Sequence, residues 1–266
     1  MHPLIQADEL NARLDEIRVF DLRWSLTDPN HGRAQYVDGH IAGAIFVDLD
    51  TDLSAPKGDG RHPLPDVDVF TGTLGRLGVE RGDEVAVYDD MAGAVAARMW
   101  WMLRAIGHET SRLLDGGLRS WTDGGLPLEE GERQAGSADY PAVDGFDGVV
   151  RFDELEDRTV VDVRAHERYT GESEPVDPKA GHIPGAINLP IKENLDARRR
   201  FRTTAELGEL FADMGEAPIV SCGSGVNACH TALAMILSGR PMPEVYVGSF
   251  SDWSTRDLPV TEGPNP

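Results

Sequence analysis

The sequence is poor in lysine. Only three lysines occur among the 266 residues, so arginine supplies the other 22 of the 25 basic residues. Aspartate and glutamate together number 46, and the formal net charge at pH 7 is −21. A charge of this sign disfavours nucleic acid and anionic membrane surfaces as partners. Many acids with few lysines favour a halophilic protein, whose hydrated acidic surface keeps it soluble, over an ordinary acidic protein.

The chain also lacks a long apolar run. No stretch of 18 or more apolar residues occurs, so no membrane-spanning helix and no membrane partner are expected. The first 20 residues contain acids early and no apolar block before a small-residue cleavage site, which predicts a cytoplasmic protein. A length of 266 residues suits one large domain or two domains of about 100–150 residues each.

Cysteine is nearly absent. Cys222 and Cys229 are the only two, and they match no common zinc motif and provide no disulfide framework. No ligand cluster implies a metal or an organic cofactor, so neither is expected. Cys222 is therefore predicted to be a free thiol. Cys229 falls in an apolar helical pattern and is expected to pack in the core; a resolving thiol that pairs with Cys222 under oxidation is the less favoured alternative.

One stretch places Cys222 in a setting that favours reactivity. An apolar segment at 219–221 precedes it, a glycine-rich loop at 223–227 follows it, and apolar residues at helical spacing occupy 228–237. This order predicts a strand, a tight loop and a helix. Loop amides and the helix N-terminus would then face the sulfur and favour a thiolate. Cys222 is thus the candidate nucleophile, and a buried structural cysteine is the alternative.

The two halves of the chain repeat the same landmarks in the same order. Strands alternate with helices, which predicts an α/β fold with mainly parallel sheets. The matched segments are 19–23 with 160–164, 38–45 with 180–187, 86–89 with 219–222, and 116–121 with 248–253. Such a repeat indicates a duplicated domain. We expect an N-terminal domain at 1–128, an exposed linker at 129–146 and a C-terminal domain at 147–266.

The two copies differ at the candidate nucleophile. The second copy has Cys222 at the end of its strand, whereas the first copy has Asp89 at the matching position. One nucleophile in a duplicated fold predicts one working site. The N-terminal copy is accordingly expected to be inactive and to act as a scaffold.

These motifs resemble those of the rhodanese family, specifically its tandem-domain sulfurtransferases, over nearly the whole chain. The segments that carry the resemblance are Gly-His-Ile-Ala-Gly-Ala (39–44), Gly-His-Ile-Pro-Gly-Ala (181–186), Cys-Gly-Ser-Gly-Val (222–226) and Gly-Ser-Phe-Ser-Asp-Trp (248–253). The resemblance implies two tandem rhodanese-like domains, with mainly parallel sheets flanked by helices. It also implies an enzyme in which Cys222 takes sulfur from a small anionic donor as a persulfide and passes it to a thiol, cyanide or a thioredoxin-like acceptor.

The resemblance bears on the donor as well. The segment Cys-Gly-Ser-Gly-Val resembles the active-site loop of 3-mercaptopyruvate sulfurtransferases. The corresponding loop of thiosulfate sulfurtransferases contains basic residues, which this chain lacks there. This favours 3-mercaptopyruvate. Arg168 matches a family arginine that holds the anionic group of the donor. A second family arginine corresponds to Asp177 here, and this departure keeps thiosulfate open as the donor.

The resemblance further implies roles around the cysteine. The loop that follows it would bind substrate, with glycines that permit close approach of the backbone; its residues are Gly223, Ser224, Gly225, Val226 and Asn227. Asn227 stands where the family loop usually has threonine, and it is expected to begin the next helix. Ser224 either donates to the leaving group or serves only loop geometry. His40 is a candidate proton relay to Ser224, although His182 at the matching place in the second copy favours a structural role for both.

Two other functions fit parts of this pattern. A cysteine phosphatase would need an arginine where this chain has Ala228, because a transferred phosphoryl group requires that positive charge. A binding module without catalysis fits the first copy, which has Asp89, but not the second. A sulfurtransferase is therefore the favoured function.

Overall fold

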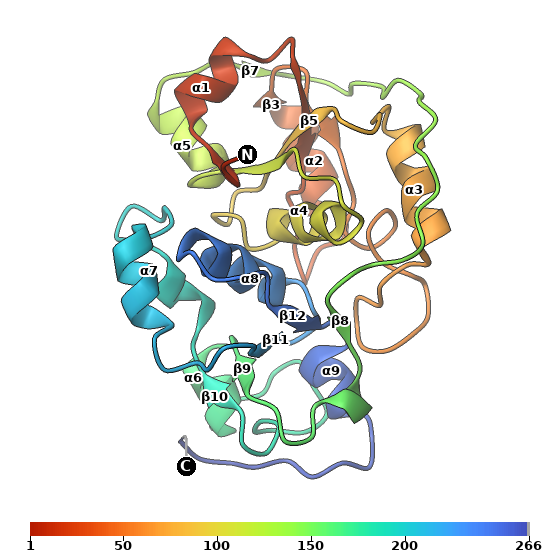
Figure 1. Cartoon of the computed structure of the whole chain (residues 1–266). Helices are drawn as coiled ribbons and strands as arrows, with labels where there is room; N and C mark the ends of the chain where they lie inside the picture. The colour runs from red at the N-terminus through yellow and green to blue at the C-terminus, as the bar shows by residue number, and fades with distance from the viewer. Residues whose placement is uncertain (265–266) are drawn as a thin grey trace. The chain divides into compact units, whose positions relative to one another are not determined.

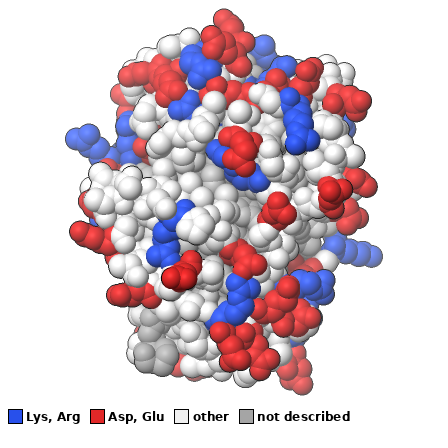
Figure 2. Space-filling view, viewed as in Figure 1, with Lys and Arg blue, Asp and Glu red and all other residues white. Residues whose placement is uncertain are grey.

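The structure is a computed structural model that describes residues 1–264 and divides them into two compact units (Figure 1). Unit 1 comprises Met1–Ala55 and Pro65–Asp147, and unit 2 comprises Pro56–Leu64 and the chain from Gly148 onward. Acidic side chains are spread over the face seen in Figure 2, with basic side chains between them. No helix among the described residues is long and apolar enough to cross a membrane.

Unit 1 is built on a five-stranded parallel sheet with the order β1-β6-β5-β2-β4. Its strands are β1 (Leu4–Ile5), β2 (Ile17–Asp21), β4 (Ile45–Phe46), β5 (Glu84–Tyr88) and β6 (Ser111–Leu114). A separate antiparallel pair consists of β3 (His40–Ile41) and β7 (Leu128–Glu129). The helices are α1 (Ala7–Ala12), α2 (His31–Asp38), α3 (Val67–Arg76), α4 (Ala96–Ala105) and α5 (Gly117–Asp123).

Unit 2 repeats this architecture with the order β10-β9-β11-β12-β8, also parallel throughout. Its strands are β8 (Val149–Val150), β9 (Val160–Asp162), β10 (Ile187–Asn188), β11 (Ile219–Ser221) and β12 (Glu244–Tyr246). Its α-helices are α6 (His166–Thr170), α7 (Thr204–Leu210), α8 (Asn227–Leu237) and α9 (Ser249–Trp253), and its 3₁₀ helices are η1 (Phe152–Glu154) and η2 (Ile191–Asn194). The predicted fold of two tandem parallel-sheet α/β domains is confirmed.

Strand β11 occupies the centre of the unit 2 sheet, between β9 and β12. Ile219 packs with Phe250 of α9 in one apolar cluster. Val220 points to the opposite face because side chains alternate along a strand, and Figure 1 shows α8 on that side. A strand covered on both faces needs a continuous apolar run. Cys222 follows the carboxyl end of this strand, and ligand-binding sites of open parallel sheets form at the carboxyl ends of the strands.

Two segments depart from the expected linear division into residues 1–128, a linker at 129–146 and residues 147–266. Pro56–Leu64 lies in the N-terminal half of the chain but belongs to unit 2. The segment expected as a linker belongs to unit 1, where the Ala138 amide donates to a carbonyl of α3 at 2.9 Å. Both departures depend on tertiary contacts, and no local change of composition marks them.

Close approach of the backbone holds Pro56–Leu64 within unit 2. The Arg61 amide donates to Ser251 Oγ at 3.0 Å. Gly60 has a φ of +81°, and a Cβ there would lie only 2.4 Å from the Gly248 carbonyl oxygen. Both the conformation and the lack of space therefore require glycine at this position. The segment is packed against the start of α9.

Asp89 follows β5 at the position that Cys222 occupies after β11. One carboxylate oxygen accepts from the amides of Met91 and Gly93, at 2.9 and 2.7 Å. The other accepts from the amides of Val95 and Ala96, at 2.7 and 2.8 Å. Burial raises the pKa of Asp89, and the four amide donors act against that rise. The loop after the central strand is thus a cradle of backbone amides that surrounds an acidic group.

Replacing Asp89 should destabilise unit 1. In Asp89→Ala the buried amides lose their acceptors, and a buried unsatisfied donor costs about 1–3 kcal/mol. We expect the free energy of unfolding in urea to fall by at least about 2 kcal/mol. The neighbouring exposed residue supplies the control, because Asp90→Ala should stay within about 0.5 kcal/mol of wild type. Equal losses in the two variants would contradict the structural role of Asp89.

Candidate active site

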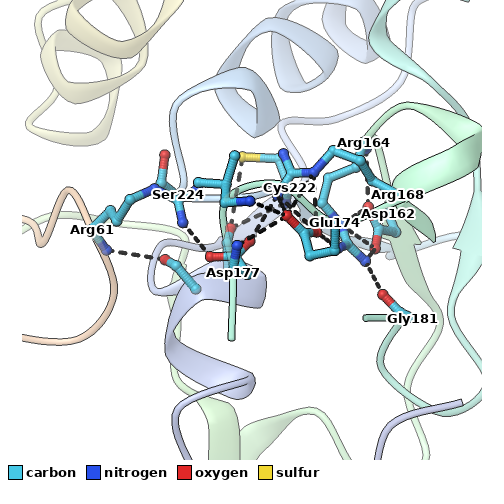
Figure 3. Close-up of polar contacts among 12 residues, drawn as sticks. Arg61, Asp162, Arg164, Arg168, Glu174, Asp177, Gly181, Cys222 and Ser224 are labelled. Carbon is cyan, nitrogen blue, oxygen red and sulfur yellow. Dashed lines mark hydrogen bonds and ion pairs between the residues drawn. The ribbon is translucent and has the colours of Figure 1, made fainter. Parts of the chain in front are cut away.

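Cys222 lies directly after β11 and is 2% exposed. The Gly225 amide donates to Cys222 Sγ at 3.1 Å, so the loop bends back over the sulfur (Figure 3). Gly225 has a φ of +74°, and a Cβ there would lie 2.1 Å from the Val247 carbonyl oxygen. No other residue fits this turn without moving the backbone. The loop brings a backbone donor to the sulfur, as the matching loop of unit 1 does to the Asp89 carboxylate.

The start of α9 fixes the cysteine loop from the other side. Ser249 Oγ accepts from the Cys222 amide at 3.1 Å and lies 3.8 Å from Cys222 Sγ. The amides of Phe250 and Ser251 donate to the carbonyls of Cys222 and Gly223, at 3.0 and 2.9 Å. The repeated motif at 248–253 was a signal for this contact, but it did not single out Ser249 as a neighbour of the sulfur.

A histidine contacts Ser224, but it is not the predicted one. His62 Nδ1 lies 2.8 Å from Ser224 Oγ, and both side chains are buried. His40 lies in unit 1, where its ring stacks on Tyr36 at 4.1 Å and its Nδ1 lies 2.9 Å from the Tyr36 carbonyl oxygen. The histidine that the structure places beside Ser224 is therefore His62, and the relay through His40 stays a prediction. His62 was missed because it lies in an irregular segment with no period or repeat.

The structural alternative for His40 agrees with its counterpart in unit 2. His182 stacks on Tyr169 at 3.7 Å, and its Nδ1 lies 2.8 Å from the Tyr169 carbonyl oxygen. The two histidines thus hold the same kind of turn in the two copies.

Arg168 extends from α6 to the cysteine loop. Its Nε and Nη2 donate to the Glu174 carboxylate at 2.8 to 3.2 Å, and Nη2 also donates to Asp177 at 2.8 Å. A Cβ placed on Gly223 would lie 3.4 Å from Arg168 Nη1. The guanidinium is therefore held from behind by two acids, while its remaining nitrogen faces the backbone next to Cys222.

Arg168 belongs to an alternating series of acids and arginines, here called the charge chain (Figure 3). Each carboxylate in the series bonds the arginine before or after it, and those inside the series bond both. In order, its members are Asp162, Arg164, Glu174, Arg168, Asp177 and Arg61. It begins at the end of β9 and ends in the segment Pro56–Leu64. Buried charges are tolerated when each is paired in this way.

Glu174 occupies the middle of the charge chain, and its side chain is 3% exposed. Burial alone would raise the pKa of Glu174, but hydrogen bonds from Arg168 and from the amides of Asp177 and Val176 bring it below its usual value of 4.5. The Glu174 carboxylate is thus ionised at neutral pH, and its negative charge can hold Arg168 in place. No sequence motif marked Glu174, since its partners are known only from the fold.

Val226, Asn227 and Cys229 lie at the start of the helix that follows the cysteine loop. Helix α8 begins at Asn227, and Val226 precedes it with 5% exposure. Cys229 is fully buried, as predicted, and its thiol donates to the Gly225 carbonyl at 3.3 Å. Neither cysteine forms a disulfide among the described residues. Among the described residues no group of three or more His, Cys, Asp or Glu side chains is placed to hold a metal ion.

Known proteins share both this fold and this arrangement of motifs. The rhodanese-like domain family matches residues 6–123 and again residues 151–256. The chain is 40% identical to the "Probable 3-mercaptopyruvate sulfurtransferase" of Pseudomonas aeruginosa over 95% of both chains. It is 38% identical to the "Putative thiosulfate sulfurtransferase SseB" of Mycobacterium tuberculosis over 95% of this chain and 94% of that one.

A solved structure agrees with these relatives. The crystal structure of SseA from Escherichia coli, described as that of a 3-mercaptopyruvate sulfotransferase, has a TM-score of 0.81 and 32% identity to this chain. The match covers 94% of this chain and 100% of that one. The chain belongs to the rhodanese family and carries its domain twice.

The lowered pKa of Glu174 makes a prediction about pH. A carboxylate whose pKa is lowered by folding stabilises the protein fully above its unfolded pKa, and this stabilisation is lost as the pH falls through the folded pKa. In Glu174→Gln, Arg168 and Arg164 lose a buried partner, so we expect a loss of about 3–5 kcal/mol in unfolding free energy at pH 7. The difference from wild type should shrink as the pH falls below 4.5.

Urea unfolding of wild type and Glu174→Gln between pH 7 and pH 3 measures this difference. Glu172→Gln is the matched control, because Glu172 is exposed and two residues away. Its unfolding free energy should stay within about 0.5 kcal/mol of wild type at pH 7. A Glu174→Gln penalty that stays constant across this pH range would show that the ionised carboxylate is not its cause.

Proposed function

We propose that this chain is a sulfurtransferase that moves a sulfane sulfur through a persulfide on Cys222, with 3-mercaptopyruvate as the favoured donor and thiosulfate as the alternative. The observation that supports it most is the hydrogen bond from the Gly225 amide to Cys222 Sγ, 3.1 Å long. A preorganised amide at the sulfur stabilises negative charge on it. The relatives reported above carry the names of sulfurtransferases for these two donors.

The first half-reaction has a balanced form for each donor. The Cys222 thiolate attacks the sulfur of 3-mercaptopyruvate, the carbon–sulfur bond breaks, and its electron pair stays on the carbon of the pyruvate enolate. The proton of the donor thiol is then needed on that carbon, which gives pyruvate and Cys–S–S⁻. With thiosulfate, the sulfur–sulfur bond breaks and sulfite leaves without any proton transfer. The persulfide then passes its outer sulfur to a thiol, cyanide or a thioredoxin-like acceptor.

Ser224 and His62 have the chemistry that only the first donor requires. Their polar atoms lie 2.8 Å apart beside the cysteine loop, a distance over which a proton can pass. We assign to this pair the transfer of the donor thiol proton to the enolate carbon. Arg168 is assigned to the anionic group of the donor, since its Nη1 faces Gly223. The pair favours 3-mercaptopyruvate over thiosulfate.

The proposal extends to the rest of the protein. The N-terminal copy, proposed as the domain at 1–128, is inactive, because Asp89 occupies the place of the nucleophile and its carboxylate already fills the amide cradle. The C-terminal copy, proposed as 147–266, is the catalytic one. We also propose a cytoplasmic site of action, and the acid-rich, lysine-poor composition favours one at high salt.

Sulfur loading tests the proposed function directly. Wild-type protein incubated with either donor should gain the mass of one sulfur atom, whereas Cys222→Ser should gain none, because the nucleophile is missing. Cys229→Ser should still gain it, since a hydroxyl can also donate to the Gly225 carbonyl. Intact-mass spectrometry at high salt makes the measurement. Wild-type protein that gains no sulfur from either donor would exclude the enzymatic function and favour a binding module.

The donors separate the role of His62. In His62→Gln we expect kcat/KM for 3-mercaptopyruvate to fall by about 10²-fold, the lower range for loss of general acid–base catalysis. Transfer from thiosulfate should change by less than about threefold, because it moves no proton. His40→Gln is the matched control, and it should change the ratio between the two donors little. Equal losses with both donors in His62→Gln would contradict the proton-transfer role.

A further inference from the structure

Two guanidinium groups, not one, face the backbone beside the nucleophile. A Cβ placed on Gly223 would lie 3.0 Å from Arg61 Nη2 and 3.4 Å from Arg168 Nη1. The two nitrogens therefore approach the same point next to Cys222. Because residue 223 is a glycine, no side chain of its own occupies this point, and a small molecule bound at the sulfur could occupy it. Figure 3 shows Arg61 coming from the segment Pro56–Leu64 and Arg168 from α6.

Asp177 holds the two arginines in this orientation. Its Oδ1 accepts from Arg61 Nη1, and its Oδ2 accepts from Arg168 Nη2 at 2.8 Å. The Asp177 side chain is only 1% exposed. Each guanidinium is thereby bonded to Asp177 through one terminal nitrogen and directs the other towards Gly223. The carboxylate also offsets the repulsion between two neighbouring positive charges.

Arg61 keeps further capacity to donate. Its Nε is buried and has no hydrogen-bond acceptor among the residues that the structure describes. A buried donor without an acceptor is costly, and a bound anion would remove that cost. Arginine presents its N–H groups in a planar fork that matches a carboxylate or a sulfonate. The donor set around Gly223 is thus suited to the charged end of a small sulfur donor.

We propose that Arg61 is the second anion-binding residue of the site, and that with Arg168 it binds the carboxylate of 3-mercaptopyruvate or the sulfonate end of thiosulfate. Asp177 occupies the place where the resembled enzymes have a second arginine, and here it acts as a positioning residue between the two. The positive charge is relocated to the N-terminal half of the chain. The inference rests on the proposed sulfur transfer.

Arg61 also lies next to the residue proposed for proton transfer. Arg61 and His62 are adjacent in sequence, and the Arg61 amide is bonded to Ser251 Oγ. The segment Pro56–Leu64 therefore delivers to unit 2 both a group for the anionic end of the donor and a group beside Ser224. The two roles remain separable, because anion binding serves both donors and proton transfer serves only one.

Arg61→Met tests this assignment. Loss of charge-assisted hydrogen bonds worth about 1.5–3 kcal/mol should raise KM for both donors by about 10- to 100-fold and change kcat by less than about threefold. In Arg61→Lys, which keeps the positive charge, KM should rise less than in Arg61→Met. Arg198→Met is the matched control, since it removes the same charge from an exposed position in unit 2, and it should leave KM unchanged.

A binding measurement keeps this test independent of turnover. In a Cys222→Ser background, calorimetric titration with pyruvate reports the anion site alone, and Arg61→Met should weaken pyruvate binding by about the same factor as KM. Arg168→Met is the positive control. Unchanged KM and pyruvate affinity in folded Arg61→Met, beside weakened binding in Arg168→Met, would overturn the role of Arg61. Failure of wild-type protein to load sulfur would instead overturn the proposed function.

Discussion

The charge chain, whose three carboxylates are buried, is the constraint on which the candidate site depends. Its ionised groups lie in and beside the unit 2 sheet, where an unpaired charge would cost several kcal/mol. Each member is acceptable only because its neighbour in the series has the opposite charge. The series therefore behaves as one structure, and the orientation of Arg168 and Arg61 at the cysteine loop follows from pairs that begin at the end of β9.

The two units share one Asp–Arg ion pair but differ in the ion pairs that extend from it. Unit 1 has the equivalent of the first pair, since Arg23 donates to Asp21 at 2.6 Å just as Arg164 does to Asp162 at 2.7 Å. Among the residues that the structure describes, a further carboxylate, Glu174, extends this ion pair in unit 2 and none extends it in unit 1. The shared pair stabilises the strand end in both copies, and the extension places positive charge near the sulfur. Duplication supplied the scaffold, and the added ion pairs distinguish the copy that has Cys222.

The loops that follow β5 and β11 also differ between the two units, in the group that their backbone amides bind. In unit 1 the cradle is filled permanently by the Asp89 carboxylate, which bonds four backbone amides. In unit 2 the shorter cysteine side chain receives the Gly225 amide, which leaves the cradle suited to a second sulfur atom on Cys222. A persulfide and a carboxylate both extend two atoms beyond Cβ and both carry negative charge. The Asp89 loop of unit 1 thus illustrates how the matching loop of unit 2 can stabilise a negative charge on Cys222.

The sequence by itself determined the duplicated α/β fold and the place of Cys222, the proposed nucleophile, at the end of a strand. The apolar run before Cys222 and the glycines after it predict a strand, a loop and a helix from local rules alone. The repeat predicts the same order of elements in the first copy. Only the tertiary structure decided which groups surround the sulfur. Arg61 and Asp177 are 116 residues apart, and His62 and Ser224 are 162 residues apart. Such pairs depend on the path of an irregular segment, which no periodicity encodes. The sequence therefore located the candidate reactive sulfur but not the residues around it.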